Sequence, residues 1–542
     1  MSLVQLMGYL MKRVLSILLL VLLAALAQPG WAQAPRWQWA DAQPFTVRAV
    51  AADAAGNAYV TGSFTGTIRV GRFQLTSTST IADLIVVKFS PQGQPEWATT
   101  LGALAPSPVV SNRTYAAGVD ISVDAQNGGV AVVGGMSGLF GPNVPGISLD
   151  PTRYQGDNML VLRLSASGQI QWAVQAGSSA GFPTRGNAIA TDAQGNSYIT
   201  GNGYGFALSN GPLISTGARQ MFVISLNRAG SFRWNTPTFA NLGASGLDIA
   251  ADEVGSVYVL GSYVGPFSIG GVELARQTGS ALARLNSSTG TVVWARGDQE
   301  GATSLAVEPQ GGAYVAGSFS GTYQLDAASI SASAAREAFL ARFTAGGAVT
   351  WLKALGTITT AGVRVARADT GPVVLLKRSA TVAAVLGLSN AGAISWEEQA
   401  TGVESAEGLA VAPGAGPRQR RVLVGGQFAG RASFPPHTLQ ANGSSSYLAS
   451  LLYTVPAAPP ASLSATVFPN PARGRFSVLL PPLSGISASL INSQGRVMRT
   501  EADFLPGKLD DKQLDVVDLP RGLYILRVSW NGEVTTVQVQ LI

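Results

Sequence analysis

The chain has 542 residues, enough for two or three domains, and only 12% of them are charged. It contains no cysteine, which excludes disulfides, thiolate metal sites and cysteine nucleophiles. The net charge of +6 is weak and dispersed, which argues against nucleic acid as a partner, and the 64 glycines favour short strands and tight turns over long helices.

The first predicted element is a secretory leader over residues 1–34. The basic pair Lys12-Arg13 precedes an apolar run over residues 14–27, and the small-residue pattern Ala32-Gln33-Ala34 follows. This order is typical of a signal peptide that is cleaved after its small-residue end. A membrane anchor is the alternative, but the run is shorter than the about 20 residues that a membrane helix needs. No transmembrane segment is therefore expected in the mature protein.

A repeat follows the leader, and its clearest feature is a column of tryptophans. A glycine stands four residues before each tryptophan, and a short apolar stretch precedes the glycine. This half of the repeat predicts a strand, a glycine turn and a second strand that carries the tryptophan. The tryptophans are Trp97, Trp172, Trp234, Trp294, Trp351 and Trp396, and the glycines are Gly93, Gly168, Gly230, Gly290, Gly347 and Gly392. Their fixed place favours a core position over a set of sugar-stacking platforms.

A second hairpin fills the other half of each repeat, and its best copies run from Asp53 to Gly62 and from Asp192 to Gly201. The acid begins a tight turn by accepting backbone N–H groups, and the Gly-Asn pair after it tolerates positive φ. The acidic position is held by Asp53, Asp124, Asp192, Asp252, Glu308 and Asp369. We interpret these acids as turn residues. Calcium is the alternative cofactor, although one carboxylate per loop falls short of the six to eight oxygens that it usually takes.

Two hairpins give four strands per repeat, and a period of roughly 60 residues indicates the blades of a β-propeller, because radial stacking buries both faces of each small sheet. The last copy ends near Tyr453 without a tryptophan strand, whereas the strand around Trp39 has no hairpin before it. We therefore predict that the N-terminal strand completes the last blade. This closes an all-β, seven-bladed β-propeller over residues 35–454 and removes open sheet edges.

The hairpin and the tryptophan strand together resemble the bacterial β-propeller repeat abbreviated SBBP. The early copies carry Asp-x-x-Gly-Asn-x-Tyr-Val-x-Gly, then Lys or Arg with Phe, then Gly and Trp, and the last two copies are degraded. The resemblance implies an extracellular propeller without an assigned activity, so it informs the fold more than the function.

The end of the chain predicts a separate small domain. A Pro-rich stretch over residues 455–462 predicts an extended linker, and the repeat pattern stops after it. Residues 463–542 contain short strands separated by turns, which predicts a small β-sandwich.

The same 463–542 segment resembles the type A sorting domain of type IX secretion substrates. The resemblance is carried by Pro469, Asn470, Pro471, Gly495, Gly522 and Tyr524, ahead of a closing apolar strand. It implies export through the periplasm and passage through an outer-membrane channel, with the type IX secretion machinery as the partner. The mature protein is then either anchored at the cell surface or released.

A search for reactive side chains leaves no catalytic, cofactor-binding or metal residue assigned. His437 is the only histidine, so a Ser-His-Asp triad or a multi-histidine metal site has at most one candidate. The cluster Arg418, Arg420 and Arg421 lies in a Pro/Gly-rich stretch and is interpreted as a solvated loop. Trp37 stands outside the tryptophan column, and its place is less constrained.

Two functions remain open, and both rest on irregular insertions over residues 101–114, 136–156 and 203–219. One is a binding or adhesion module for a surface glycan or protein, because function on regular scaffolds commonly lies in such loops. The other is an exported hydrolase, directed at glycans or peptides, with its site in the same loops. A pair of acids for glycoside hydrolysis is not excluded by count.

Overall fold

The computed structural model describes residues 34–103, 114–137, 155–178, 180–209, 211–214, 219–297, 301–360, 362–455, 465–479, 487–500, 504–506, 511–530 and 533–542. The leader before Ala34, most of the linker and parts of the three insertions lie outside these residues. One compact unit ends at Val455, and the C-terminal residues belong to another. The described residues include no helix of the length and hydrophobicity that a membrane span requires.

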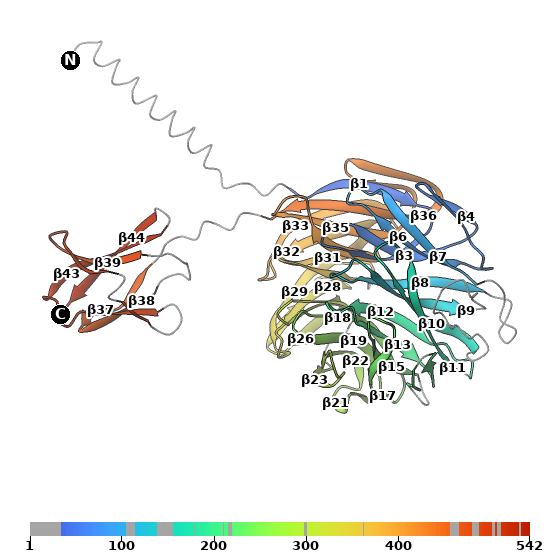
Figure 1. Cartoon of the computed structure of the whole chain (residues 1–542), viewed down its shortest axis with the longest axis horizontal. Coiled ribbons are helices and arrows are strands. Elements are labelled where there is room, and N and C mark those ends of the chain that lie inside the picture. Colours follow the sequence, from blue (N-terminus) through green and yellow to red (C-terminus); the bar gives the residue numbers. More distant parts are fainter. Residues whose placement is uncertain are drawn as a thin grey trace, which may run out of the picture. The chain divides into compact units, whose positions relative to one another are not determined.

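The larger unit is built from antiparallel sheets that follow one another along the chain (Figure 1). Sheet 1 contains β2 (Thr46–Ala52), β3 (Ala58–Phe64), β6 (Asp83–Phe89) and β7 (Pro95–Leu101). Sheet 2 contains β8 (Tyr115–Val123), β9 (Val130–Ser137), β10 (Gln155–Leu164), β11 (Ile170–Ser178) and the short β14 (Ala207–Leu208). Sheet 3 contains β12 (Arg185–Thr191), β13 (Ser197–Gly203), β15 (Gln220–Leu226) and β16 (Phe232–Thr236). Sheet 4 contains β18 (Ala244–Ala251), β19 (Ser256–Val264), β22 (Thr278–Asn286) and β23 (Val292–Arg296); sheet 5 contains β24 (Ala302–Val307), β25 (Ala313–Phe319), β28 (Glu337–Phe343) and β29 (Val349–Thr357).

Sheets 6 and 7 are joined into one eight-stranded sheet, because β33 also pairs with β35. Sheet 6 contains β30 (Arg364–Ala368), β31 (Gly371–Ser379), β32 (Val382–Leu388) and β33 (Ile394–Val403); sheet 7 contains β34 (Gly408–Pro413), β35 (Gln419–Phe434), β36 (His437–Thr454) and β1 (Arg36–Gln43). Small outer sheets are formed by β4 (Thr67–Val70) with β5 (Phe73–Thr76), by β17 (Thr238–Ala240) with β20 (Phe267–Ile269) and β21 (Val272–Leu274), and by β26 (Thr322–Leu325) with β27 (Ala328–Ser331).

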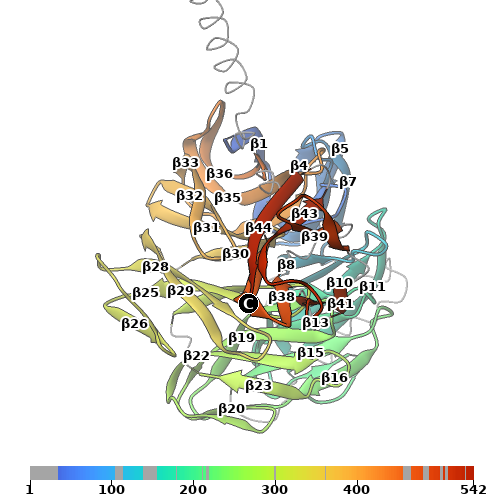
Figure 2. The same ribbon diagram turned by 90° about the vertical axis from the view of Figure 1, so that its left-hand side faces the viewer.

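The sheets of this unit form a closed, propeller-like ring. Figure 2 shows them placed around a common centre. Their innermost strands contact one another in the order β2, β8, β12, β18, β24, β30 and β34, and β34 contacts β2. The hydrophobic core follows the same order: each cluster is shared by two neighbouring sheets, and one of them packs Leu423 and Leu448 of sheet 7 with Val60 and Val87 of sheet 1. Radial stacking therefore buries both faces of each sheet.

The N-terminal strand β1 forms the outer edge of sheet 7. It runs antiparallel to β36, with Arg36 opposite Leu452 and Gln43 opposite Ser446. In Figure 1 the blue β1 accordingly lies beside the orange β36. Trp37 on this strand is only 3% exposed, and its ring lies 5.1 Å from that of Phe434. The expectation that Trp37 is loosely constrained is therefore wrong, because the residue is part of the core.

The tryptophan column connects each sheet to the next. Indole Nε1 of Trp172 donates to the carbonyl oxygen of Arg228, at 2.9 Å, in the β15–β16 turn of the following sheet. Gly230 of that turn lies against the indole, since a Cβ there would be 2.7 Å from the ring. Equivalent hydrogen bonds run from Trp39, Trp97, Trp234, Trp294 and Trp351 to the carbonyls of Pro91, Ala166, Ser287, Ala345 and Asn390. The glycine and the tryptophan of one repeat thus contact different neighbours.

The expected solvated arginine loop is also wrong for two of its three residues. Arg420 and Arg421 lie in β35 rather than in a loop. The Arg420 guanidinium pairs with Asp369 in sheet 6, whereas Arg421 is buried and donates to Ser450 at 2.6 Å. The Pro/Gly-rich stretch hides the start of this strand, because it ends directly before Gln419.

The C-terminal unit has its own core. Its strands are β37 (Thr466–Arg473), β38 (Arg475–Leu479), β39 (Ser487–Asn492), β40 (Val497–Thr500), β41 (Phe504–Pro506), β42 (Asp511–Asp515), β43 (Gly522–Trp530) and β44 (Glu533–Leu541). One group pairs as β37-β38-β42-β41 and the other as β40-β39-β43-β44, and a parallel bridge from Ala472 to Leu541 joins them. Phe476, Leu490 and Leu526 belong to the single core of this unit.

Candidate functional site

The three insertions expected to carry function leave the ring at one face. We call this the start face, because the first strand of each sheet begins there and its antiparallel second strand ends there. The insertion over 101–114 joins β7 to β8, that over 136–156 joins β9 to β10, and that over 203–219 joins β13 to β15. Parts of each lie outside the described residues, but the described ends of all three share this face.

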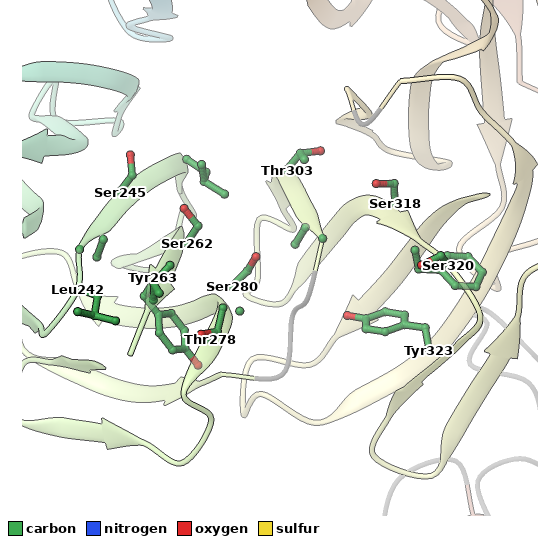
Figure 3. Close-up of a pocket in the computed structure, with 18 of the residues that line it drawn as sticks. Leu242, Ser245, Ser262, Tyr263, Thr278, Ser280, Thr303, Ser318, Ser320 and Tyr323 are labelled. Atoms are coloured by element: carbon green, nitrogen blue, oxygen red, sulfur yellow. The ribbon is translucent and has the colours of Figure 1, made fainter. Parts of the chain in front are cut away.

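A cavity of about 810 Å³ opens at the start face between sheets 4 and 5. Its walls come from β18, β19 and β22 on one side and from β24 and β25 on the other, and Tyr204 and Arg219 of the third insertion also line it. Figure 3 shows Ser245, Ser262 and Ser280 on one side of the gap and Thr303, Ser318 and Tyr323 on the other. Hydroxyl groups dominate this lining, and none of the described lining residues is acidic or histidine.

The cavity exists because sheet 4 has a glycine where its neighbours have a polar side chain. The residues at this register, opposite the end of the second strand, are Asp83, Asn158, Gln220, Gly279 and Glu337 in sheets 1 to 5. The carboxylate of Asp83 accepts the backbone N–H of Ser79 at 2.9 Å, and that of Glu337 accepts the N–H of Ser333 at 2.9 Å. A Cβ at Gly279 would meet only a carbonyl oxygen at 3.6 Å, so the equivalent space is open.

Two serine hydroxyls that line this cavity have no hydrogen-bond partner among the described residues. Ser280 is 4% exposed and Ser318 is 9% exposed, and neither side chain forms a hydrogen bond within the described part of the chain. Both hydroxyl oxygens open onto the cavity, where a ligand can donate hydrogen bonds to them and accept hydrogen bonds from them. Sequence reasoning missed both residues, since a serine in an apolar strand carries no motif.

A second cavity, of about 450 Å³, lies at the centre of the ring and is lined by the first strand of every sheet. A β-bulge interrupts β2, β8, β12, β18 and β24 at this level. Asp120 beside one bulge accepts the backbone N–H of Ile189 in the next sheet, and Asp248 accepts that of Leu305, both at 2.8 Å. These carboxylates tie neighbouring sheets together, which makes them structural.

Burial raises the pKa of Asp120 to about 7, and the nearby carboxylate of Asp248 adds to the increase. Burial also raises the pKa of Asp248, although hydrogen bonds and Arg364 oppose it. The sequence signal for both residues is the recurrence of Gly-x-Asp-Ile at Gly118 and Gly246. A bulge departs from the alternation by which strands are recognised, so strand patterns do not reveal this recurrence.

The raised pKa of Asp120 predicts a pH-dependent stability. An aspartate in the unfolded chain titrates near 3.9, so between about pH 4 and 7 the folded state binds more protons, and this group's stabilisation is lost as the pH rises. We expect the thermal midpoint to fall from pH 5 to pH 8, and to fall less in Asp120→Asn, in scanning calorimetry. Asp326→Asn is the control, because Arg296 lowers the pKa of Asp326 and leaves it ionised throughout. An unchanged slope in Asp120→Asn would contradict the assignment.

Four members of the predicted acidic column accept N–H groups of their own turns, whereas Glu308 and Asp369 pair with arginines. One carboxylate oxygen of Asp53 accepts the backbone N–H groups of Ala55 and Asn57, both at 2.9 Å, and the other accepts the Asn57 amide and the Tyr59 hydroxyl. Asp192 repeats this pattern. At Asp53 and Asp192, hydrogen bonds of the turn therefore occupy both carboxylate oxygens, and the described residues contain no cluster of three or more acidic or histidine ligands.

The remaining candidates are not among the residues that line the cavity. His437 begins β36, in the hairpin with β35, and pairs with Phe434. The sorting residues belong to the C-terminal unit: Asn470 in β37 donates from its amide to the carbonyl of Gln538 at 2.7 Å and accepts the N–H of Gln540 at 2.9 Å. These two hydrogen bonds of the Asn470 side chain resemble the backbone hydrogen bonds that a neighbouring strand would form with β44.

The other sorting residues shape turns and the core of the same unit. Pro469 and Pro471 flank Asn470 in β37 and are exposed. Gly495 has a φ of 81° in the β39–β40 turn, a left-handed conformation that favours glycine. Gly522 begins β43, and Tyr524, 4% exposed, donates to the carbonyl of the residue four before it at 2.8 Å. Five of the six sorting residues therefore lie in β37 or β43, and both of these strands pair with β44.

Residues 466–542 match the family of secretion system C-terminal sorting domains. The C-terminal unit is thus a type IX sorting domain, which indicates export to the cell surface or the extracellular space and interaction with the type IX secretion machinery. No curated protein matches the chain.

Several solved structures are similar to the chain at low identity. BamB from Moraxella catarrhalis is 12% identical with a TM-score of 0.37, over 78% of this chain and all of that one. The Plexin A4 extracellular region is 9% identical with a TM-score of 0.37, over 92% of this chain and 62% of that one. The Hadza microbial sialidase Hz136 is 12% identical with a TM-score of 0.35, over 64% of each chain.

Proposed function

We propose that this chain is an exported glycan-binding module in which a seven-bladed β-propeller of SBBP-type repeats, residues 35–454, presents the hydroxyl-lined cavity. The leader over residues 1–34 takes the chain out of the cytoplasm. The linker over 455–462 and a small β-sandwich over 463–542 then deliver it to the type IX machinery, with the Pro469-Asn470-Pro471 segment as part of the sorting signal. The pairing of β1 with β36 supports closure of the last blade.

The observation that carries this proposal is the pair of serine hydroxyls, at Ser280 and Ser318, that line one cavity and have no hydrogen-bond partner in the described part of the chain. Sugars offer many hydroxyls that both donate and accept hydrogen bonds, as serine does, so a saccharide can satisfy both groups. Glycoside hydrolysis canonically needs a pair of carboxylates. Since the described lining supplies none, the cavity favours binding over hydrolysis.

Blocking the mouth of the cavity tests this function. Ser320 is exposed at the rim, so Ser320→Trp should obstruct the cavity without a core change, whereas Ser231→Trp places the same bulk in a turn at the opposite face. On a printed glycan array, we expect the unchanged chain and Ser231→Trp to bind the same glycans, and Ser320→Trp to lose at least tenfold in signal. An array without hits, or hits that Ser320→Trp leaves unchanged, would reject the proposal. Cleavage of the bound glycans would favour the hydrolase instead.

A further inference from the structure

Two arginines flank the cavity at equivalent places of the ring. Arg219 stands directly before β15 and Arg336 directly before β28, the third strands of sheets 3 and 5. Thr278 begins the third strand of sheet 4 and lies between them in the order of the sheets. All three line the cavity, and both arginines are exposed. The opening around Gly279 therefore has a guanidinium on either side.

Neither guanidinium is neutralised by a carboxylate in the described part of the chain. Nε of Arg219 donates to the Asn202 side-chain oxygen at 3.1 Å, and the Asn202 amide donates to Ser245 of the cavity wall at 2.8 Å. This chain of contacts orients Arg219 and leaves its terminal nitrogens available. By contrast, Arg48, which lines the second cavity at the centre of the ring, is paired with Glu407 at 3.0 Å. The cavity thus has two arginine side chains available for a ligand, and none of its described lining residues is acidic.

An aromatic pair lies beside the same opening. Tyr204, which lines the cavity, and Phe182 have ring centroids 5.1 Å apart and planes inclined by 31°. Phe182 is 51% exposed, so the aromatic pair is accessible from solvent. The negative face of an aromatic ring attracts partly positive C–H groups, such as those on one face of a sugar ring.

From these contacts we infer that the ligand is an anionic saccharide, whose carboxylate or sulfate groups pair with Arg219 and Arg336 while one sugar ring lies on Tyr204. This inference rests on the proposed glycan-binding function and specifies its ligand class. Arginine pairs with planar carboxylates and with oxyanions through two parallel N–H bonds, which is a geometry-specific contact. The free hydroxyls of Ser280 and Ser318 then bind the neutral part of the same molecule.

Oligogalacturonate and its fully methyl-esterified form test the charge, because the two share their sugar rings and differ in the carboxylate. By titration calorimetry with the full secreted chain, we expect the acid to bind at least tenfold more tightly than the ester. Arg219→Gln and Arg336→Gln should each weaken the acid by about tenfold and leave the ester unchanged. Arg431→Gln, an exposed arginine of β35, is the matched control and should change neither.

Two further probes separate the sources of charge and the contribution of the sugar. A sulfated dextran oligosaccharide is the first probe. If it binds where the uronate does not, and if both arginine variants lose affinity for it by about tenfold, the anionic group is a sulfate and the inference is supported. Inorganic polyphosphate that binds as tightly as the saccharides, without loss in Tyr204→Ala, would overturn it, because the site would then recognise charge alone. Equal binding of acid and ester would overturn it too. If Ser320→Trp still abolished that binding, the glycan-binding function would stand.

Discussion

Deletion of residues 35–42 should lower the thermal midpoint of the ring by about 10 °C or more. The deletion removes β1 and with it two tryptophans, each of which contributes roughly 3–5 kcal/mol in a core. Trp37 packs against Phe434, and Trp39 donates to the carbonyl of Pro91 at 3.0 Å in sheet 1. The deletion also exposes the edge of β36, which favours aggregation. Scanning calorimetry and light scattering would measure both effects.

A peptide supplied in trans provides the control for this deletion. A synthetic peptide of residues 35–43 should raise the midpoint of the truncated chain in a concentration-dependent way, because it binds only the folded ring. The same peptide with Trp37 and Trp39 replaced by alanine should have no effect. A truncated chain that melts like the full one would mean that β1 does not close the ring.

Replacing Gly230 with alanine should cost the ring about 2–5 kcal/mol of unfolding free energy. Its φ of 84° is left-handed, which costs a residue with a Cβ about 1–2 kcal/mol. The new Cβ would also lie 2.7 Å from the indole of Trp172. Overpacking of this kind costs typically 1–3 kcal/mol and here acts on the contact between sheets 2 and 3. Urea unfolding followed by tryptophan fluorescence would measure the change.

Gly271 separates the two contributions, because it has the same φ of 84° and no atom within 4 Å of its would-be Cβ. Gly271→Ala should therefore show only the backbone cost of about 1–2 kcal/mol. The difference between the two variants then measures the packing of the turn on Trp172. If both variants lost the same free energy, the glycine column would reflect turn geometry and not contact with the indole.

The four-strand repeat was predictable because its signals come from residues that must be constant. Gly230 has to lack a side chain since Trp172 occupies that space, and Asp53 has to accept the N–H groups of its own turn. Each requirement recurs in sheet after sheet, and recurrence is what one sequence can reveal. Buried Trp37 occurs once, and its core position depends on Phe434 from the far end of the chain, so spacing alone does not reveal it.

The candidate site was not predictable for the opposite reason. It arises where Gly279 lacks a side chain that Asp83 and Glu337 supply elsewhere, and a missing side chain leaves no pattern of its own. The register of β22 against β19 has to be known before the difference is visible. The insertion over 203–219 was a correct signal for the face of the ring on which the cavity lies, because Tyr204 and Arg219 near its two ends line the cavity. The serines on the strands carried no signal.

Closure by β1 also sets the order of events during folding. The strand β1 pairs with β36 from the far end of the ring, with Arg36 opposite Leu452. Contacts between such distant positions form slowly, since the intervening chain must first be ordered. The first strand of the ring therefore completes its pairing only when the last hairpin has folded, and until then the edge of β36 lacks a partner.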